Sequence, residues 1–195
     1  SKVRSQIGLG YLLARISDTI ADSIRGSAIQ RLEALEHYND RIQNRRNTLP
    51  SLANLAKLQH NPAEAELLEK AATPVAYLEE FSNTDQQFIR RVLDIIISGQ
   101  TLDIQRFSNA NSNSIVSLNK EEELNDYTYR VAGCVGEFWT QISLNHLFEV
   151  HAAKEAQLFQ NAVLFGKALQ LINILRDLPE DLRSGRCYIP STVLA

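Results

Sequence analysis

The chain has 195 residues, of which 44% are hydrophobic and 22% are charged, with a net charge of −3 at pH 7. This length allows one domain with a sizeable core, and the slightly acidic balance gives no reason to expect nucleic acid as a partner, because such partners usually require a basic surface. Cys134 and Cys187 lie far apart and form no CxxC unit, which indicates thiols in a reducing compartment rather than a disulfide framework.

No apolar run approaches the roughly 20 residues that a helix needs to span a bilayer. The N-terminal segment Ser1–Ser5 lacks the apolar core of a signal peptide. We therefore expect a cytoplasmic protein, with peripheral contact to a membrane surface as a further option.

Apolar residues that recur every three to four positions predict an all-α protein, and few breaks are expected because the chain has only 8 glycines and 5 prolines. Helices are predicted over residues 2–24, 27–46, 62–72, 85–107, 121–148 and 154–178. Asn61 and Pro62 supply an N-cap and a first helical residue, whereas the small polar residues of 108–114 predict the clearest loop. Residues 1–195 are expected to form a single domain.

Asp18 and Asp22 lie four residues apart on the first predicted helix, so their carboxylates share one face. Their like charges repel, and a cation between them would remove that penalty. Arg15 lies one turn earlier on the same side, and its guanidinium suits phosphate oxygens. This unit predicts a metal site beside a phosphate site. The competing interpretation is a solvated acidic face, which is common at this spacing.

A second set of polar residues forms one stripe of the last predicted helix: Gln170, Asn173, Asp177 and Asp181. The neighbouring positions are apolar, which predicts a buried helix whose polar groups need partners; a cavity with Mg²⁺ and water would provide them. Pro179 should kink or end the helix near residue 178, which would place Asp181 in a turn where Glu180 could compete as a ligand. The alternative is an amphipathic helix with an acidic end, although the helix dipole disfavours acids there.

Carboxylate and amide oxygens without a His or Cys cluster suit Mg²⁺ better than zinc. Mg²⁺ is commonly completed by substrate phosphates, so two aspartate pairs around a diphosphate would form a chemically complete site in which the metal neutralises charge on a leaving diphosphate. His146 and His151 point apart on a helix, which makes a metal site there a weak hypothesis. The sequence contains no GxSxG, P-loop or GxGxxG motif.

Four segments resemble, in order and spacing, the signatures of the squalene/phytoene synthase family: Tyr11–Asp22, Gly99–Asp103, Tyr127–Trp139 and Ala168–Pro190. The first and last contain the aspartate pairs, and the third contains a VAGxVG motif. The resemblance implies an all-α, isoprenoid synthase-type helical bundle around a central cavity. It also implies that the bundle is incomplete at both ends, because family members begin with a further helix and continue past the GRxYxP segment.

The resemblance implies Mg²⁺-dependent head-to-head (1′–1) joining of two prenyl diphosphates. Metal binding is implied for Asp18, Asp22, Asn173, Asp177 and Asp181, and these four aspartates would be catalytic together with Tyr127, which would face the diphosphate. Contacts to the diphosphate or its metals are implied for Arg15, Gln170, Asn173 and Arg176. Asp103 would line the pocket. Gly133 and Gly136 would leave room for a prenyl tail, with close helix packing as the alternative.

The segment Val131–Trp139 is most similar in wording to bacterial squalene synthases, which favours two farnesyl diphosphates as substrates and presqualene diphosphate or squalene as product. NADPH would be used if squalene is the product. Trp139 could shorten the tail pocket or face away from it. Phytoene or dehydrosqualene synthesis is the alternative activity, and a non-catalytic assembly or scaffold protein is the alternative of another class. A terpene cyclase is disfavoured because the chain lacks DDxxD. The oligomeric state is left open.

Overall fold

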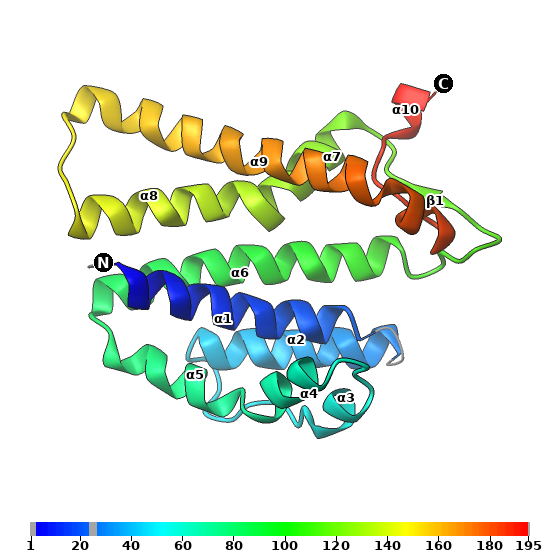
Figure 1. The fold of residues 1–195 in the computed structure, drawn as a ribbon, viewed down its shortest axis with the longest axis horizontal. Helices are drawn as coiled ribbons and strands as arrows, with labels where there is room; N and C mark the ends of the chain where they lie inside the picture. Colours follow the sequence, from blue (N-terminus) through cyan, green and yellow to red (C-terminus); the bar gives the residue numbers. More distant parts are fainter. Residues whose placement is uncertain (1–2, 24–26, 195) are drawn as a thin grey trace.

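The computed structural model describes residues 3–23 and 27–194, and nearly all of its regular structure is helical (Figure 1). The elements are α1 (Arg4–Ala21), α2 (Ala28–Ile42), α3 (Ala53–Lys57), α4 (Pro62–Glu69), α5 (Ala72–Tyr77), a 3₁₀ turn (Leu78–Glu80), α6 (Asn83–Arg106), β1 (Val116–Ser117), α7 (Glu121–Thr128), a π turn (Tyr129–Gly133), α8 (Cys134–His146), α9 (Ala152–Arg183), β2 (Arg186–Cys187) and α10 (Ser191–Leu194). The prediction of an all-α protein is confirmed. α6 is central: α1 and α2 pack on one side of it, and α8 packs on the other side with α9 beyond.

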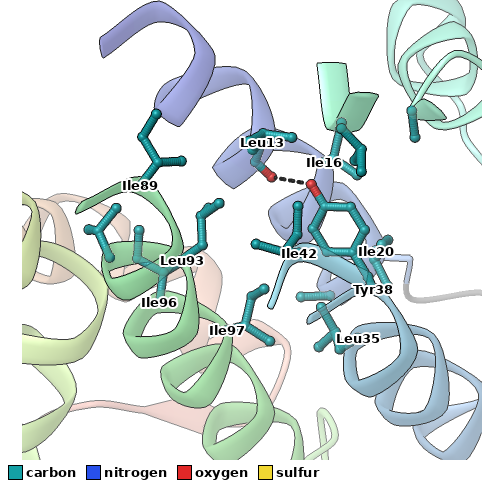
Figure 2. Close-up of a cluster of buried hydrophobic side chains, with 14 of the residues drawn as sticks. Leu13, Ile16, Ile20, Leu35, Tyr38, Ile42, Ile89, Leu93, Ile96 and Ile97 are labelled. Carbon is teal, nitrogen blue, oxygen red and sulfur yellow. Dashed lines mark hydrogen bonds between the residues drawn. The ribbon is translucent and has the colours of Figure 1, made fainter. Parts of the chain in front are cut away.

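A core of aliphatic side chains joins α1, α2 and α6 (Figure 2). On α1, the fully buried Leu13, Ile16 and Ile20 recur at helical spacing and form one face. Tyr38 of α2 is also fully buried, and its hydroxyl donates a hydrogen bond of 3.0 Å to the carbonyl oxygen of Leu13. Burial of each such side chain contributes roughly 1.5–3 kcal/mol. This core therefore fixes the orientation of α1, including the other face, which carries the first acid pair.

Polar side chains set the beginnings of several helices. Ser27 forms a capping box at the start of α2, and Asn61 caps α4 ahead of Pro62, as the sequence predicts. Ser82 caps α6, so that helix begins two residues earlier than expected. The predicted helix over 121–148 is divided into α7, the π turn and α8. The division lies at a close contact with α6, since a Cβ atom on Gly99 would lie 2.9 Å from the Cβ atom of Arg130.

α9 continues through Pro179 to Arg183, so the predicted end near residue 178 is wrong. Proline removes the hydrogen bond to the carbonyl four residues earlier, that of Leu175. Leu175 is 64% exposed, so water can reach this stretch of the helix. Because α9 continues, Asp181 lies one helical turn after Asp177 and on the same face, rather than in a separate turn.

Much of α9 is apolar and exposed, whereas the sequence predicts a buried helix. Its exposed large side chains include Leu164, Phe165, Leu169, Leu171, Ile172, Leu175 and Leu182. By length and composition alone α9 is long and apolar enough to cross a membrane, which contradicts the expectation that the chain has no such run. Since α9 also carries the polar stripe of residues 170–181, we interpret it as a bundle helix with one apolar face.

Candidate active site

A cavity of about 960 Å³ is lined by residues of α1, α2, α6, α7, the π turn, α8 and α9, together with the segments after α6 and around β2. Ten residues that the sequence singles out line this cavity: Arg15, Asp18, Asp22, Asp103, Tyr127, Gln170, Asn173, Arg176, Asp177 and Asp181. Apolar side chains contribute to the same wall, among them Ile96, Ile104, Val131, Val135 and Ile174. The structure thus brings both aspartate pairs to one cavity, and the roles assigned to these residues stay predictions.

The α1 wall of the cavity is acidic and only partly neutralised. Arg15 donates a hydrogen bond to Asp18 and another, of 2.7 Å, to Glu64 of α4. Burial raises the pKa of Asp18, and the ion pair with Arg15 opposes that rise. Asp22 follows the last residue of α1, and its pKa is raised to about 6 by desolvation and by the charge of Asp18. The repulsion expected from the spacing of these two acids is therefore present. Sequence spacing did not reveal Glu64, because it lies 49 residues from Arg15.

The α9 wall carries an exposed ion pair and a partly enclosed acid. Arg176 forms two hydrogen bonds to Asp177, of 2.7 and 2.6 Å, and these lower the pKa of that carboxyl. Desolvation raises the pKa of Asp181, whereas the charge of Arg186 opposes the rise. To bind phosphate, Arg176 would have to give up its hydrogen bonds to Asp177. Arg15 would likewise have to give up its hydrogen bond to Asp18 on α1.

Arg186 and Tyr188 also line the cavity, although no role was predicted for them from the sequence. They come from the segment after α9, where β2 pairs in parallel with β1. Gly185 makes this approach possible: its φ is +84°, and a Cβ atom there would lie 2.3 Å from the carbonyl oxygen of Asn111. The available signal was a glycine directly before an arginine inside the segment Ala168–Pro190.

Two tyrosines and Asp103 form the floor beneath these acids. The Tyr188 hydroxyl donates a hydrogen bond of 2.8 Å to Asp103 Oδ1. Its ring stacks on Tyr127 with centroids 4.7 Å apart and meets Phe107 edge-on at 5.1 Å. Burial raises the pKa of Asp103, against the hydrogen bond from Tyr188 and the charge of Arg186. Burial also raises the pKa of both tyrosines, so both hydroxyls are neutral donors at physiological pH.

Gly133 and Gly136 are not among the described residues that line the cavity. A Cβ atom on Gly136 would lie 2.1 Å from the carbonyl oxygen of Ala162, and one on Gly133 would lie 3.3 Å from Val163. α9 packs closely against both glycines, which supports the packing interpretation, and their contact with a prenyl tail stays a prediction. Trp139 is 49% exposed on α8 and is likewise outside the described lining, so the structure does not support a pocket-shortening role for it.

The donor atoms fit a magnesium site that a diphosphate completes. Over residues 3–23 and 27–194, no three His, Cys, Asp or Glu side chains are close enough to hold a metal ion by themselves. The described lining offers carboxylate and amide oxygens but no His or Cys. Mg²⁺ usually takes one or two carboxylates and fills its remaining positions with water and phosphate oxygens. Asp18, Asp22, Asn173, Asp177 and Asp181 can provide such ligands, whereas a closed zinc site would need a complete protein shell.

Residues 1–195 match the model of the family described as squalene/phytoene synthase. The phytoene synthase of Arthrospira platensis is 27% identical over 202 aligned residues, which cover 98% of this chain and 54% of that protein. The presqualene diphosphate synthase of Rhodopseudomonas palustris is 30% identical over 184 aligned residues, which cover 94% of this chain and 52% of that protein. The chain therefore spans about half the length of these two relatives.

The solved structure described as the complex of TcSQS with the ligand E5700 resembles this chain with a TM-score of 0.70 and 20% sequence identity. The match covers 93% of this chain and 47% of that chain, and it shows that the helical fold is shared. The family match, in turn, extends over every residue of the sequence and agrees with the four motif segments. The chain belongs to the squalene/phytoene synthase family.

Proposed function

We propose that this site joins two prenyl diphosphates head to head (1′–1), with farnesyl diphosphate as both substrates and presqualene diphosphate or squalene as the product. One observation carries the proposal: the aspartate pairs of α1 and α9 face a single cavity, and each pair has an arginine bonded to it. Arginine binds phosphate oxygens through paired hydrogen bonds, and carboxylates are preferred ligands of Mg²⁺. The relative named presqualene diphosphate synthase supports the choice of product.

The residues of this chain supply binding, orientation and a dry environment. Bound Mg²⁺ would neutralise the charge that develops on a leaving diphosphate. Arg15 and Arg176 would bind phosphate oxygens in exchange for their present carboxylate partners. The neutral hydroxyl of Tyr127 can donate a further hydrogen bond to the diphosphate. Apolar residues such as Ile96 and Val135 lie in the same cavity, where they exclude water that would otherwise trap a cationic carbon.

The test is product analysis of the purified protein with Mg²⁺ and farnesyl diphosphate, with and without NADPH. We expect presqualene diphosphate without NADPH and, if the chain performs both steps, squalene with it. Asp18→Asn and Asp177→Asn should each lower the rate by about 10²–10³-fold, the range for removing one group that stabilises transition-state charge. Glu69→Gln, an exposed carboxylate of α4, is the control and should leave the rate unchanged. Absence of any consumption of prenyl diphosphate by the protein would refute the proposal.

Phytoene or dehydrosqualene synthesis is the second candidate, and the similarity to a phytoene synthase over 98% of the chain favours it equally. The same assay separates the two. Phytoene from geranylgeranyl diphosphate, or dehydrosqualene from farnesyl diphosphate without NADPH, would replace squalene as the assigned product while leaving the head-to-head reaction in place.

A further inference from the structure

Arg186 lies among three carboxylates of the candidate site. Its guanidinium is 3.5 Å from Asp181 Oδ1 and 3.9 Å from Asp103 Oδ2. Asp22 lines the same cavity, and its charge is one of the causes that raise the pKa of Arg186. These three acids come from α9, α6 and the end of α1. Both measured distances exceed the roughly 2.7–2.9 Å of a charged hydrogen bond, so Arg186 supplies positive charge to the group without tying up either carboxylate in a close contact.

The backbone holds Arg186 in place from both sides. The carbonyl groups of the residues before and after it accept hydrogen bonds of 2.8 and 3.1 Å from the amides of Val116 and Leu118. The Nε atom of Arg186 donates a further hydrogen bond of 3.2 Å to the hydroxyl of Ser184. A guanidinium at the end of a free surface chain would sample many positions, whereas this one starts from a paired strand and is confined to the cavity wall.

Asp103 is engaged on both of its oxygens by residues of this one segment. Oδ1 accepts the hydrogen bond from Tyr188, and Oδ2 faces Arg186. Arg186 and Tyr188 are two positions apart in an extended segment, so their side chains reach the same carboxyl group from one strand face. The hydrogen bond from Tyr188 therefore anchors the segment at Asp103, while the charge of Arg186 lowers the pKa of Asp103 and also those of Asp22 and Asp181, the two predicted metal ligands of the group.

We propose, on the basis of the proposed function, that Arg186 is a positioning residue that makes Mg²⁺ uptake by this site conditional on diphosphate. A fixed positive charge beside Asp22 and Asp181 repels a bare Mg²⁺ ion. The same charge attracts diphosphate, whose negative charge is larger in magnitude than the positive charge of one Mg²⁺ ion. The two effects have opposite sign, and both act through charge at short range in a partly enclosed site where water screens them less than at an open surface.

The proposed role and a purely structural role of Arg186 predict different changes in ligand affinity when the residue is replaced. If Arg186 only held the cavity wall in shape, its removal would weaken the binding of every ligand. If its charge couples the two ligands, its removal strengthens Mg²⁺ binding in the absence of diphosphate and weakens it in the presence of diphosphate. Such coupling is reciprocal, so pyrophosphate affinity must change with Mg²⁺ in the same proportion.

The experiment is isothermal titration of the purified protein with Mg²⁺, alone and with saturating inorganic pyrophosphate, which needs no catalytic turnover. We expect Arg186→Gln to tighten binding of Mg²⁺ alone by about threefold or more, as loss of a nearby like charge predicts. We expect it to weaken binding of Mg²⁺ with pyrophosphate by about tenfold, the lower end of the effect of residues that support metal ligands. Arg186→Lys keeps the charge and should retain most of the coupling.

Arg183→Gln is the matched control, because it removes the same charge from the exposed end of α9, outside the described cavity lining. Arg186→Met serves as a second charge-free variant, and circular dichroism checks that each variant is folded. Weakening of both titrations by Arg186→Gln and Arg186→Met, or no change in either, would overturn the inference. A wild-type protein that shows no Mg²⁺ binding with pyrophosphate would instead contradict the proposed function itself, so the two failures are distinguishable.

Discussion

At the scale of one residue, Asp22 shows how the candidate site lowers the folding stability of the protein. Its pKa is raised to about 6 by desolvation and by the charge of Asp18. A raised carboxyl pKa means that the folded chain keeps a proton that the unfolded chain has already released between about pH 4 and pH 6. Folding stability therefore falls as the pH rises through that window, and the charged, metal-free site is least stable above pH 6.

We predict that Asp22→Asn stabilises the metal-free protein at pH 7 by about 1 kcal/mol, a value reduced from the full pKa shift because solvent screens a side chain that opens to the cavity. Urea unfolding at several pH values measures this difference. The gain should be largest above pH 6 and should disappear below about pH 3, where Asp22 is protonated in both the folded and the unfolded chain. A gain that is the same at every pH would show that electrostatic repulsion is not its source.

Tyr188 combines a hydrogen bond with ring packing, and two substitutions separate these contributions. Tyr188→Phe removes only the hydroxyl that binds Asp103, so we expect it to lower the free energy of unfolding by about 1 kcal/mol. Tyr188→Ala also removes the stacking on Tyr127 and the contact with Phe107, which should lower it by about 3–5 kcal/mol. Chemical unfolding at fixed pH measures both. Equal effects would mean that the rings contribute nothing beyond the hydroxyl.

At the scale of helices, the packing of α8 on α9 depends on glycine. A Cβ atom on Gly136 would lie 2.1 Å from the carbonyl oxygen of Ala162, so Gly136→Ala should separate the helices and lower the free energy of unfolding by about 1–3 kcal/mol. Gly8 of α1 is exposed and has nothing within 4 Å of its Cβ position. Gly8→Ala is the matched control and should stabilise the protein by up to about 1 kcal/mol through helix propensity. Thermal unfolding compares the two variants, and a neutral Gly136→Ala would contradict the packing account.

Elements were predictable from the sequence where the signal is local. Helical spacing of apolar residues and the Asn61 cap located the main helices, because side chains and backbone within one turn determine both. The course of α9 through Pro179 was not predictable, since it depends on how water and neighbouring helices compensate the missing hydrogen bond. The π turn near Arg130 was missed for the same reason: it occurs at a contact with α6, which lies more than twenty residues earlier in the chain.

The same distinction between local and long-range contacts applies to the candidate site. Asp18 and Asp22 could be placed on one face because four residues make about one helical turn, and family resemblance joined them to the second pair. The partners that set their charge could not be found in this way. Glu64 reaches Arg15 from another helix, and Arg186 reaches Asp181 from a strand that exists only because it pairs with β1. Contacts of this kind depend on the path of the whole chain.

At the scale of the whole molecule, a buried polar cluster ties three helices together at the end opposite β1 and β2 (Figure 1). Asp85 at the start of α6 is 2% exposed; it accepts a hydrogen bond of 3.1 Å from Gln6 of α1 and lies 2.7 Å from the Nε2 atom of His146 at the end of α8. Burial raises the pKa of Asp85, but the hydrogen bonds outweigh it and the net pKa is lowered. Its stabilising effect is thus present above the unfolded pKa and is lost as the pH falls through the folded one.

We predict that Asp85→Asn lowers the free energy of unfolding at pH 7 by about 1–3 kcal/mol, because buried partners lose a charged acceptor. The difference from wild type should begin to shrink below about pH 4, where Asp85 of the unfolded chain becomes protonated, and should be lost as the pH falls through the lowered pKa of the folded chain. Glu66→Gln, which breaks the exposed ion pair with Lys70 at the end of α4, is the control and should leave stability essentially unchanged. Denaturant unfolding at several pH values between 7 and about 2.5 tests both, and a difference that stays undiminished down to the lowest pH would contradict this role.

The contact between Gly185 and Asn111 also limits how the chain can vary. Loops with small polar residues usually tolerate insertions, and the stretch from residue 108 to 114 has that composition. Here, however, the loop leads into β1, and the pairing of Val116 with Arg186 fixes the backbone position from which the guanidinium extends into the cavity. An added residue between this loop and β1 would shift β1 against β2 and disturb the amide–carbonyl hydrogen bonds that hold the backbone on both sides of Arg186. The length of a surface loop thereby helps to set the position of Arg186 in the candidate site.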